Sequence, residues 1–254
     1  MDRLAFTAVA AINEQRIALQ MSTNEMANVA TVGFKRSFEA ALRAINVEGP
    51  GLSTRQQPQS LSNDYITMTP GALMATGNKL DIALRDSTVL GVSAPNGELA
   101  FTRRGDLRLS AKGTLENGSG HPVRGQGGAV ITAPPGVMLS IQSDGSVFGT
   151  DPAATGNVPP VLLGNLLLRD ASQTKLQRRE DGLFKVVGAA TGQDMPPGPN
   201  LPSLTAGALE GSNVNPLEVM VKLIEQSRSF EQQINMIKEA KATDESGETM
   251  MKAS

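Results

Sequence analysis

The sequence has no cysteine and no tryptophan, and it contains one tyrosine and one histidine. Without thiols, the chain cannot build a disulfide framework, a thiolate metal site or a cysteine nucleophile. Seven phenylalanines and one tyrosine in 254 residues leave few aromatic faces on which bases could stack. These absences argue against thiol chemistry and against recognition of nucleic acids or sugars through aromatic stacking.

Positive charge and long apolar runs are also missing. The formal net charge is -2, whereas nucleic-acid-binding domains carry a basic patch or stripe. No stretch approaches the roughly 20 apolar residues of a membrane-spanning helix. Polar residues 13–16 interrupt the first apolar stretch before any small-residue cleavage site, so we expect no secretory signal peptide. We therefore predict no nucleic-acid partner and no direct membrane insertion.

Candidate catalytic groups are scarce and isolated. His121, the only histidine, lies in GSGHPVRG without a nucleophile or a second ligand at a familiar spacing. The glycine-rich GHPVRGQGG lacks the lysine and the following helix of a phosphate-binding P-loop. Asp144 and Asp181 each precede glycine, which is typical of turns. We predict no catalytic, cofactor-binding or metal-binding residues, no cofactor and no small-molecule substrate. A secreted β-rich hydrolase that uses His121 is the alternative from another functional class.

Both ends of the chain show a helical period. Residues 4–30 and residues 216–241 each repeat with alternating steps of three and four, the spacing of a coiled-coil seam. Polar residues interrupt both stripes, so each helix should be marginal alone. Asn213 or Asn215 could cap the second helix. The helices are expected to pair with each other, or alternatively to pack separately on the central domain. The apolar seam positions are Val9, Ile12, Leu19 and Met26 in the first helix, and Met220, Leu223, Phe230, Ile234 and Ile237 in the second.

The period changes to two between the helices. Residues 99–117 alternate around Arg104-Gly105 and Lys112-Gly113, and Asp144-Gly145 and Asp181-Gly182 mark further hairpin turns. LLGNLLLRD, residues 162–170, is expected to form one short buried strand. Short strands separated by closely spaced turns predict an all-β sandwich or barrel.

These patterns predict an α+β fold class, in which the N- and C-terminal helices pair as a coiled-coil domain beside a central all-β domain. Residues 1–45 and 207–254 are expected to form the discontinuous helical domain, and residues 62–188 the β domain. The period-free residues 46–61 and the Gly/Pro-rich residues 189–206 are expected to be linkers.

Residues 24–35, NEMANVATVGFK, carry a specific motif. Three further segments follow it: TPGALMATGNKLDIAL (69–84), FTRRGDLRLSAKGTLENGSGHPVRG (101–125) and GALEGSNVNPLEVMVKLIEQSRSFE (207–231). In this order the four segments resemble the bacterial flagellar rod and hook family over nearly the whole chain. Residues 86–91 depart from the Gly-x-Gly-aromatic run of the family, and residues 227–230 only partly keep its Gln-Arg-x-aromatic pattern. The residues of the family motif are Asn24, Ala27, Asn28, Thr31, Gly33, Phe34 and Lys35 near the start, and Leu209, Glu210, Ser212, Asn213 and Val214 near the end.

The resemblance implies a structural subunit of the flagellar basal-body rod, part of the drive shaft needed for motility, and not an enzyme. The short stretch between Phe34 and residue 69 favours a proximal rod subunit, with a distal rod or other axial subunit as the alternative. The implied partners are other rod subunits, further copies of the chain, and the flagellar type III export apparatus. The implied location is the rod spanning the periplasm, reached without a cleavable signal peptide. The terminal helices would lie at the core of a tube.

Gly33 is expected to end the first helix as a C-cap with a left-handed backbone and to turn the chain outward. The same residues could form a purely structural helix end in a monomeric protein.

Overall fold

The computed structural model of the chain describes residues 2–37, 42–46, 56–60, 65–152 and 159–252. It divides into two compact units. The helical unit contains Met1–Ala27, Glu39–Asn63 and Asn215–Ser254, and the β unit contains Asn28–Phe38 and Asp64–Val214. The chain thus has one helix near each terminus and a central β domain, as the sequence predicts.

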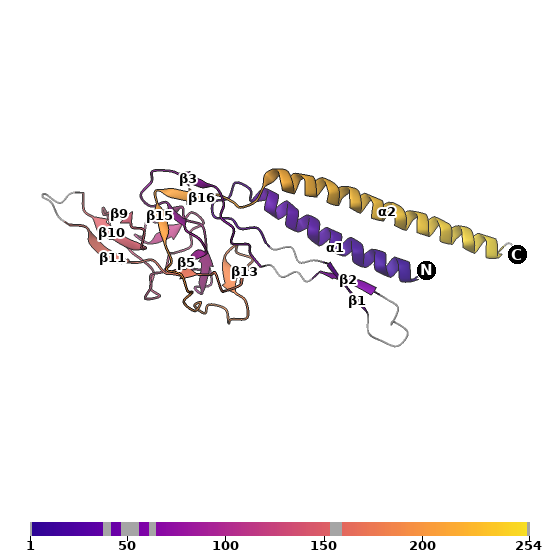
Figure 1. Cartoon of the computed structure of the whole chain (residues 1–254), viewed down its shortest axis with the longest axis horizontal. Helices are drawn as coiled ribbons and strands as arrows, with labels where there is room; N and C mark the ends of the chain where they lie inside the picture. Colours follow the sequence, from indigo (N-terminus) through magenta and orange to yellow (C-terminus); the bar gives the residue numbers. More distant parts are fainter. Residues whose placement is uncertain (1, 38–41, 47–55, 61–64, 153–158, 253–254) are drawn as a thin grey trace. The chain divides into compact units, whose positions relative to one another are not determined.

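Two long helices, α1 (Asp2–Ala27) and α2 (Pro216–Lys252), lie side by side in the helical unit (Figure 1). Oδ1 of Asn215 accepts the backbone N–H groups of Leu217 (3.1 Å) and Glu218 (3.5 Å). Asn215, and not Asn213, is therefore the N-cap of α2. The helix continues beyond residue 241, where the sequence suggested its end.

The helical unit also contains a strand pair that the sequence did not predict: its second strand lies in the expected linker 46–61, and its first strand lies, except for Asn46, in the expected helical domain 1–45. Strands β1 (Leu42–Asn46) and β2 (Gln56–Ser60) pair antiparallel, with Leu42 opposite Ser60. The sequence of β2, QQPQS, has no apolar alternation and contains a proline, so it carries no strand signal. Both strands of a two-stranded ribbon are edge strands, where proline is tolerated. The ladder rests on backbone hydrogen bonds, which hydropathy does not reveal.

The β unit is built around a five-stranded antiparallel sheet with the order β12-β5-β6-β14-β13. A three-stranded sheet, β11-β10-β9, and the pairs β15-β4, β16-β3 and β7-β8 complete the unit. The strands are β3 (Leu73–Ala75), β4 (Ile82–Leu84), β5 (Thr88–Ser93), β6 (Leu99–Thr102), β7 (Leu107–Leu109), β8 (Leu115–Asn117), β9 (Met138–Ile141), β10 (Ser146–Thr150), β11 (Val161–Asn165), β12 (Leu168–Asp170), β13 (Leu176–Arg178), β14 (Phe184–Val186), β15 (Leu204–Ala206) and β16 (Ala208–Glu210).

The five-stranded sheet has hydrophobic core on both of its faces. Leu90 and Val92 of β5 belong to the larger cluster of buried side chains, whereas Val89 belongs to a second cluster together with Phe101. Consecutive strand residues point to opposite faces of a sheet. Burying one such side chain fully stabilises the fold by about 1.5–3 kcal/mol. The clusters on both faces therefore make β5 the centre of the β unit.

Three of the four predicted turns form hairpins. Gly113, Gly145 and Gly182 have φ angles of 76°, 87° and 78°, and they lie in the turns of β7–β8, β9–β10 and β13–β14. The prediction of a hairpin at Arg104-Gly105 was wrong, because β6 pairs with β5 and β14 while β7 pairs with β8. Gly105 instead accepts the N–H of Ile82 through its carbonyl (2.9 Å). A Cβ at Gly105 would lie 1.8 Å from the Ile82 carbonyl oxygen, so this crossing requires glycine.

Residues 162–170 form parts of two strands and not one buried strand. Strand β11 lies in the three-stranded sheet, and β12 in the five-stranded sheet. Val161 and Leu162 are exposed, whereas Leu166 to Leu168 are buried. A continuous apolar run has no period from which the end of a strand could be located.

The boundaries of the two units differ from those expected from the sequence. Strands β15 and β16 pair with β4 and β3, so residues 204–214 belong to the β unit and not to a linker or to the helical domain. Residues 28–38 also belong to the β unit, although the sequence suggested a helical domain over 1–45. Both differences arise from pairings between distant segments, which local periodicity does not report.

Candidate functional site

Two segments from distant parts of the sequence run together in the β unit. The N–H of Gly33 donates to the carbonyl of Glu210 (2.7 Å), and the N–H of Asn213 donates to the carbonyl of Phe34 (3.2 Å). The N–H of Arg36 donates to Oδ1 of Asn213 (2.7 Å). We call residues 33–36 and 210–213 the terminal joint. It connects the first part of the family motif with the second.

Three buried charged side chains hold the terminal joint. Nζ of Lys35 lies 2.7 Å from Oε1 of Glu210, and the Arg103 guanidinium lies 2.7 Å from Oε2 of the same carboxylate. Lys35 is 0%, Arg103 1% and Glu210 4% exposed. We call these residues the charge triad. Two cations share one carboxylate, so the formal charge of the triad is positive.

Backbone groups complete the hydrogen bonding of the charge triad. Lys35 Nζ also donates to the carbonyl of Thr69 (2.7 Å), and the N–H of Gly71 donates to Oε1 of Glu210 (3.0 Å). The other donors of Arg103 reach carbonyl oxygens: Leu84 (2.6 Å), Thr88 (3.1 Å) and Asp86. Buried charges are tolerated when they are paired and hydrogen-bonded, and this site meets both conditions.

Burial and a neighbouring cation lower the pKa of Lys35. Desolvation has the largest effect, and the positive charge of Arg103 acts in the same direction. The hydrogen bond and the negative charge of Glu210 oppose both. Glu210 therefore partly offsets the effects of burial and of the neighbouring arginine on the pKa of Lys35. Removing one partner of a buried ion pair usually costs about 3–5 kcal/mol, because the other charge is left uncompensated.

Gly33 occupies a position that admits no side chain. Its φ of 67° confirms the predicted left-handed backbone, and a Cβ would lie 2.3 Å from the carbonyl oxygen of Arg103. Gly33 is not the C-cap of α1, however, which corrects the sequence interpretation. The helix ends at Ala27, and the N–H of Thr31 donates to the carbonyl of Asn28 (3.1 Å) in a separate turn. Gly33 therefore allows the backbone at residue 33 to pass close to the backbone of Arg103 within the β unit.

Asn213 and Phe34 tie further segments to the terminal joint. Nδ2 of Asn213 donates to the carbonyls of Thr67 (3.0 Å) and Thr69 (3.2 Å). The Arg178 guanidinium lies 4.2 Å from the centre of the Phe34 ring, in cation–π contact, and it donates to the carbonyl of Lys35. The joint thus binds the 65–70 segment and strand β13.

The other motif residues divide between the two units. Thr31 Oγ1 donates to Oδ1 of Asn28 (3.1 Å), Ser212 Oγ accepts the N–H of Val214 (3.2 Å), and Leu209 pairs with β3. All of these lie in the β unit, whereas Asn24 and Ala27 lie on α1 in the helical unit. The structure brings together Gly33, Phe34, Lys35, Glu210 and Asn213 within the terminal joint.

Arg103, Thr69 and Gly71 complete the site but were not predicted as site residues. Their segments were recognised in the sequence as FTRRG and TPGAL, so the signal was present. A fully buried arginine needs a carboxylate partner or several carbonyl acceptors. Nothing in the local sequence indicates, however, that Arg103 is buried or that Glu210 is its partner.

The expected helix seam is only partly buried. Ile12, Leu19 and Met26 of α1 are half-buried, and so are Leu223, Phe230, Ile234 and Ile237 of α2. Val9 is 65% and Met220 46% exposed, so neither belongs to a buried seam in this chain.

Polar contacts between the helices explain why their buried contact differs from the apolar seam expected from the sequence. Nε2 of Gln15 donates to the carbonyl of Gln226 (2.8 Å), and Nε2 of Gln233 donates to Oε1 of Gln15 (3.5 Å). The more buried line of α2 runs through Val219, next to Met220, and through half-buried Gln226. Glutamines were not considered as seam residues because they do not contribute to an apolar stripe. An exposed apolar stripe is left on α2: Leu217, Met220, Val221 and Ile224.

His121 directly follows the turn at residues 118–120, and Asn117 holds it there. Its N–H donates to Oδ1 of Asn117 (2.9 Å), and Nδ1 lies 3.5 Å from Nδ2 of Asn117. Burial lowers the pKa of His121; the charge of Asp181 opposes this shift and that of Arg104 adds to it. Within the described ranges, no group of three or more His, Cys, Asp or Glu side chains is placed to hold a metal ion.

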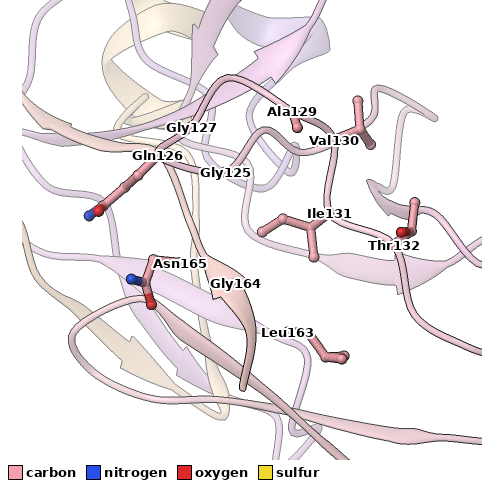
Figure 2. Close-up of a pocket in the computed structure, with 10 residues that line it drawn as sticks. All are labelled: Gly125, Gln126, Gly127, Ala129, Val130, Ile131, Thr132, Leu163, Gly164 and Asn165. Atoms are coloured by element: carbon pink, nitrogen blue, oxygen red, sulfur yellow. The ribbon is translucent and has the colours of Figure 1, made fainter. Parts of the chain in front are cut away.

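One hollow of about 310 Å³ lies between the 125–132 loop and β11 (Figure 2). Its polar side chains are the neutral Gln126, Thr132 and Asn165, and its other lining residues are glycines and apolar residues. None of these side chains can serve as a general acid, a base or a charged ligand. In the part of the chain that the structure describes, neither helix is both long and apolar enough to span a membrane.

Comparisons with known proteins give the class of this fold. The chain matches the family described as "Flagellar hook protein FlgE/F/G D1 domain" over residues 88–149, and "Flagellar basal body rod FlgEFG protein C-terminal" over residues 205–250. Arg103 lies in the first match, and Glu210 and Asn213 in the second. The matched domains are those of flagellar rod and hook subunits.

Individual relatives narrow the class to rod proteins. The flagellar basal-body rod proteins FlgF of Salmonella typhimurium and Escherichia coli are 36% and 34% identical to the chain, each over 93% of both sequences. The rod protein FlgG of Buchnera aphidicola subsp. Schizaphis graminum is 29% identical over 87% of this chain and 88% of its own. The chain belongs to the family of flagellar basal-body rod proteins.

Proposed function

We propose that the chain is a structural subunit of the flagellar basal-body rod that assembles with other rod subunits and with further copies of itself into the proximal rod. The observation that carries the proposal is the similarity to two FlgF proteins over 93% of the chain. The terminal joint supports it, because the two parts of the family motif meet there around buried charges. A distal rod position is the nearest alternative, since FlgG also aligns with most of the chain.

The exposed stripe of α2 suggests how subunits associate. Leu217, Met220, Val221 and Ile224 are 72%, 46%, 55% and 53% exposed, although they lie within two turns of one helix. We propose that α1 and α2 act as a coiled-coil domain whose free apolar stripe is covered by helices of neighbouring subunits. Such contacts join different surfaces on successive copies, and heterologous contacts that do not close generate helical filaments.

We further propose that the subunit is exported through the flagellar type III apparatus without a cleavable signal peptide and is placed in the rod spanning the periplasm. The family relationship supports this route. The marginal helices also support it, because helices that need neighbouring copies for most of their packing can remain loosely ordered until assembly.

The proposed role is structural and not enzymatic. Among the described residues, the polar side chains of the hollow in Figure 2 are neutral and His121 is held by Asn117, and neither observation supports the hydrolase alternative. Replacing His121 with alanine separates the two functions, because a hydrolase would lose its only histidine. We expect the His121→Ala strain to remain motile.

Location tests the proposed function directly. An epitope-tagged chain that restores motility to a deletion strain should be labelled by immunoelectron microscopy in purified basal bodies, within the proximal part of the rod. Labelling of the distal rod would favour the alternative position. A motile deletion strain, or basal bodies that lack the tagged chain, would exclude a rod subunit.

A further inference from the structure

The charge triad is assembled from parts of the chain that are far apart in sequence. Lys35 and Arg103 precede most of the β unit, whereas Glu210 lies in β16, the last strand of that unit. Separations of 175 and 107 residues divide Glu210 from Lys35 and Arg103. Among the described residues, Glu210 is the only carboxylate within ion-pairing distance of either cation.

Without β16, the remaining β unit would enclose two cations. Lys35 would keep the Thr69 carbonyl, and Arg103 would keep the carbonyls of Leu84 and Thr88. These acceptors are neutral, and the Glu210 carboxylate would be absent. Transferring an unpaired charge into a protein interior is strongly unfavourable. The five-stranded sheet could form its backbone ladder, but burying Lys35 and Arg103 without a counter-charge would be opposed.

We infer that Glu210 controls closure of the β unit: the unit stays open, with Lys35 and Arg103 hydrated, until the segment containing Glu210 arrives. The same segment brings the backbone bonds of the terminal joint, since the Glu210 carbonyl accepts the N–H of Gly33. Closure of the core and joining of the two parts of the chain are therefore one event. In a subunit exported N-terminus first, which rests on the proposed function, folding would wait for nearly complete passage of the chain.

The first test removes the charge of Glu210 and keeps its shape. In the full-length Glu210→Gln variant, hydrogen exchange from the amides of β5 and β6 at pH 7 should accelerate on the order of 100- to 1,000-fold, because two cations are left without a counter-charge. The matched control is Asp194→Asn, which neutralises a carboxylate in the exposed ion pair with Arg169. That control should change exchange by less than about fivefold, as expected for a surface pair.

Two further measurements distinguish charge from packing. Raising the pH to 9.5 should recover part of the stability of Glu210→Gln relative to the wild type at the same pH, because Lys35 can then lose its proton. The double variant Lys35→Met/Glu210→Gln should be more stable than Glu210→Gln at pH 7 and should lack this recovery. A Glu210→Gln chain as stable as the Asp194→Asn control would overturn the inference. So would a loss of stability that neither high pH nor Lys35→Met relieves.

The order of folding is tested by pulsed hydrogen exchange during refolding of the wild-type chain. The amides of Gly33 and Gly211, which bond to the carbonyls of Glu210 and Ala72, should become protected in the same kinetic step as those of β5 and β6. Protection of β5 and β6 in an earlier step would overturn the inference. These measurements use the isolated chain, so their outcome is independent of its place in the rod.

Discussion

Two glycines of the β unit should differ sharply in their tolerance for substitution. Gly33 and Gly77 both have left-handed backbones, with φ of 67° and 72°. A Cβ at Gly33 would collide with Arg103, whereas a Cβ at Gly77 would meet no atom within 4 Å. The two glycines therefore separate the cost of the backbone conformation from the cost of the close contact.

We expect Gly33→Ala to destabilise the β unit well beyond Gly77→Ala. The control should lose about 1–2 kcal/mol, the usual cost of a left-handed L-residue, and Gly33→Ala should lose at least about 2 kcal/mol more because the backbone must move. Urea unfolding of both variants measures the difference. Gly33→Val should be worse and should leave cells without a completed rod. Equal losses for the two alanine variants would contradict the contact with Arg103.

Asp170 should give the β unit part of its acid sensitivity. Burial tends to raise the pKa of this carboxyl, but hydrogen bonds from the backbone of Asn200, and from the backbone and hydroxyl of Ser172, lower it overall. A carboxyl with a lowered folded-state pKa stabilises the fold fully above its unfolded pKa, about 3.9. That stabilisation disappears as the pH falls through the folded-state pKa.

The free energy of unfolding should therefore decrease with falling pH below about pH 5, and less steeply in Asp170→Asn. Denaturant unfolding at several values between pH 7 and pH 3 measures both slopes. Identical slopes would mean that Asp170 does not titrate differently in the folded and unfolded chains.

At the scale of elements, the sequence predicted those features that depend on neighbouring residues in the chain. The hairpins at Gly113, Gly145 and Gly182 were predictable because a left-handed turn between two strands leaves a short sequence signal. Strands β15 and β16 were missed because each is three residues long and pairs with a distant strand. Arg103 was missed for a related reason: its burial depends on Glu210, which lies 107 residues further on. Sequence periodicity indicates which side of a helix or strand is buried, but not which distant segment packs against it.

Positions along α2 should differ in how much they stabilise the helical unit. Ile234 is half-buried, whereas Met236 is 62% exposed on the same helix. A carboxylate at position 234 would be partly desolvated, so Ile234→Asp should weaken the helical unit by about 2 kcal/mol. Met236→Asp should have a smaller effect in the free chain, and deletion of the mostly polar residues 242–254 should also be milder.

Circular dichroism of the purified variants and motility of the corresponding strains test this prediction. A motile Ile234→Asp strain, or a deletion that is more harmful than Ile234→Asp, would contradict the role of Ile234 in the helix contact.

For the whole molecule, the two units should differ in stability before assembly. The β unit has hydrophobic clusters on both faces of its central sheet and a buried charge triad. The helices meet through half-buried residues and glutamine hydrogen bonds, and α2 keeps an exposed apolar stripe. Hydrogen exchange in the dilute chain should therefore protect residues 82–186 far more than residues 2–27 and 216–252. Equal protection would contradict helices that depend on neighbouring copies.

The terminal joint also has a mechanical consequence. Its hydrogen bonds connect residue 33 to 210, and residues 34 and 36 to 213, so both segments advance in the same direction. The chain enters the first segment from α1 and leaves the second toward α2. Tension that pulls these two connections apart therefore acts along the segments and loads their bonds in shear, all together. Three hydrogen bonds loaded in this way share the force, so the terminal joint should resist such tension better than bonds that open one at a time.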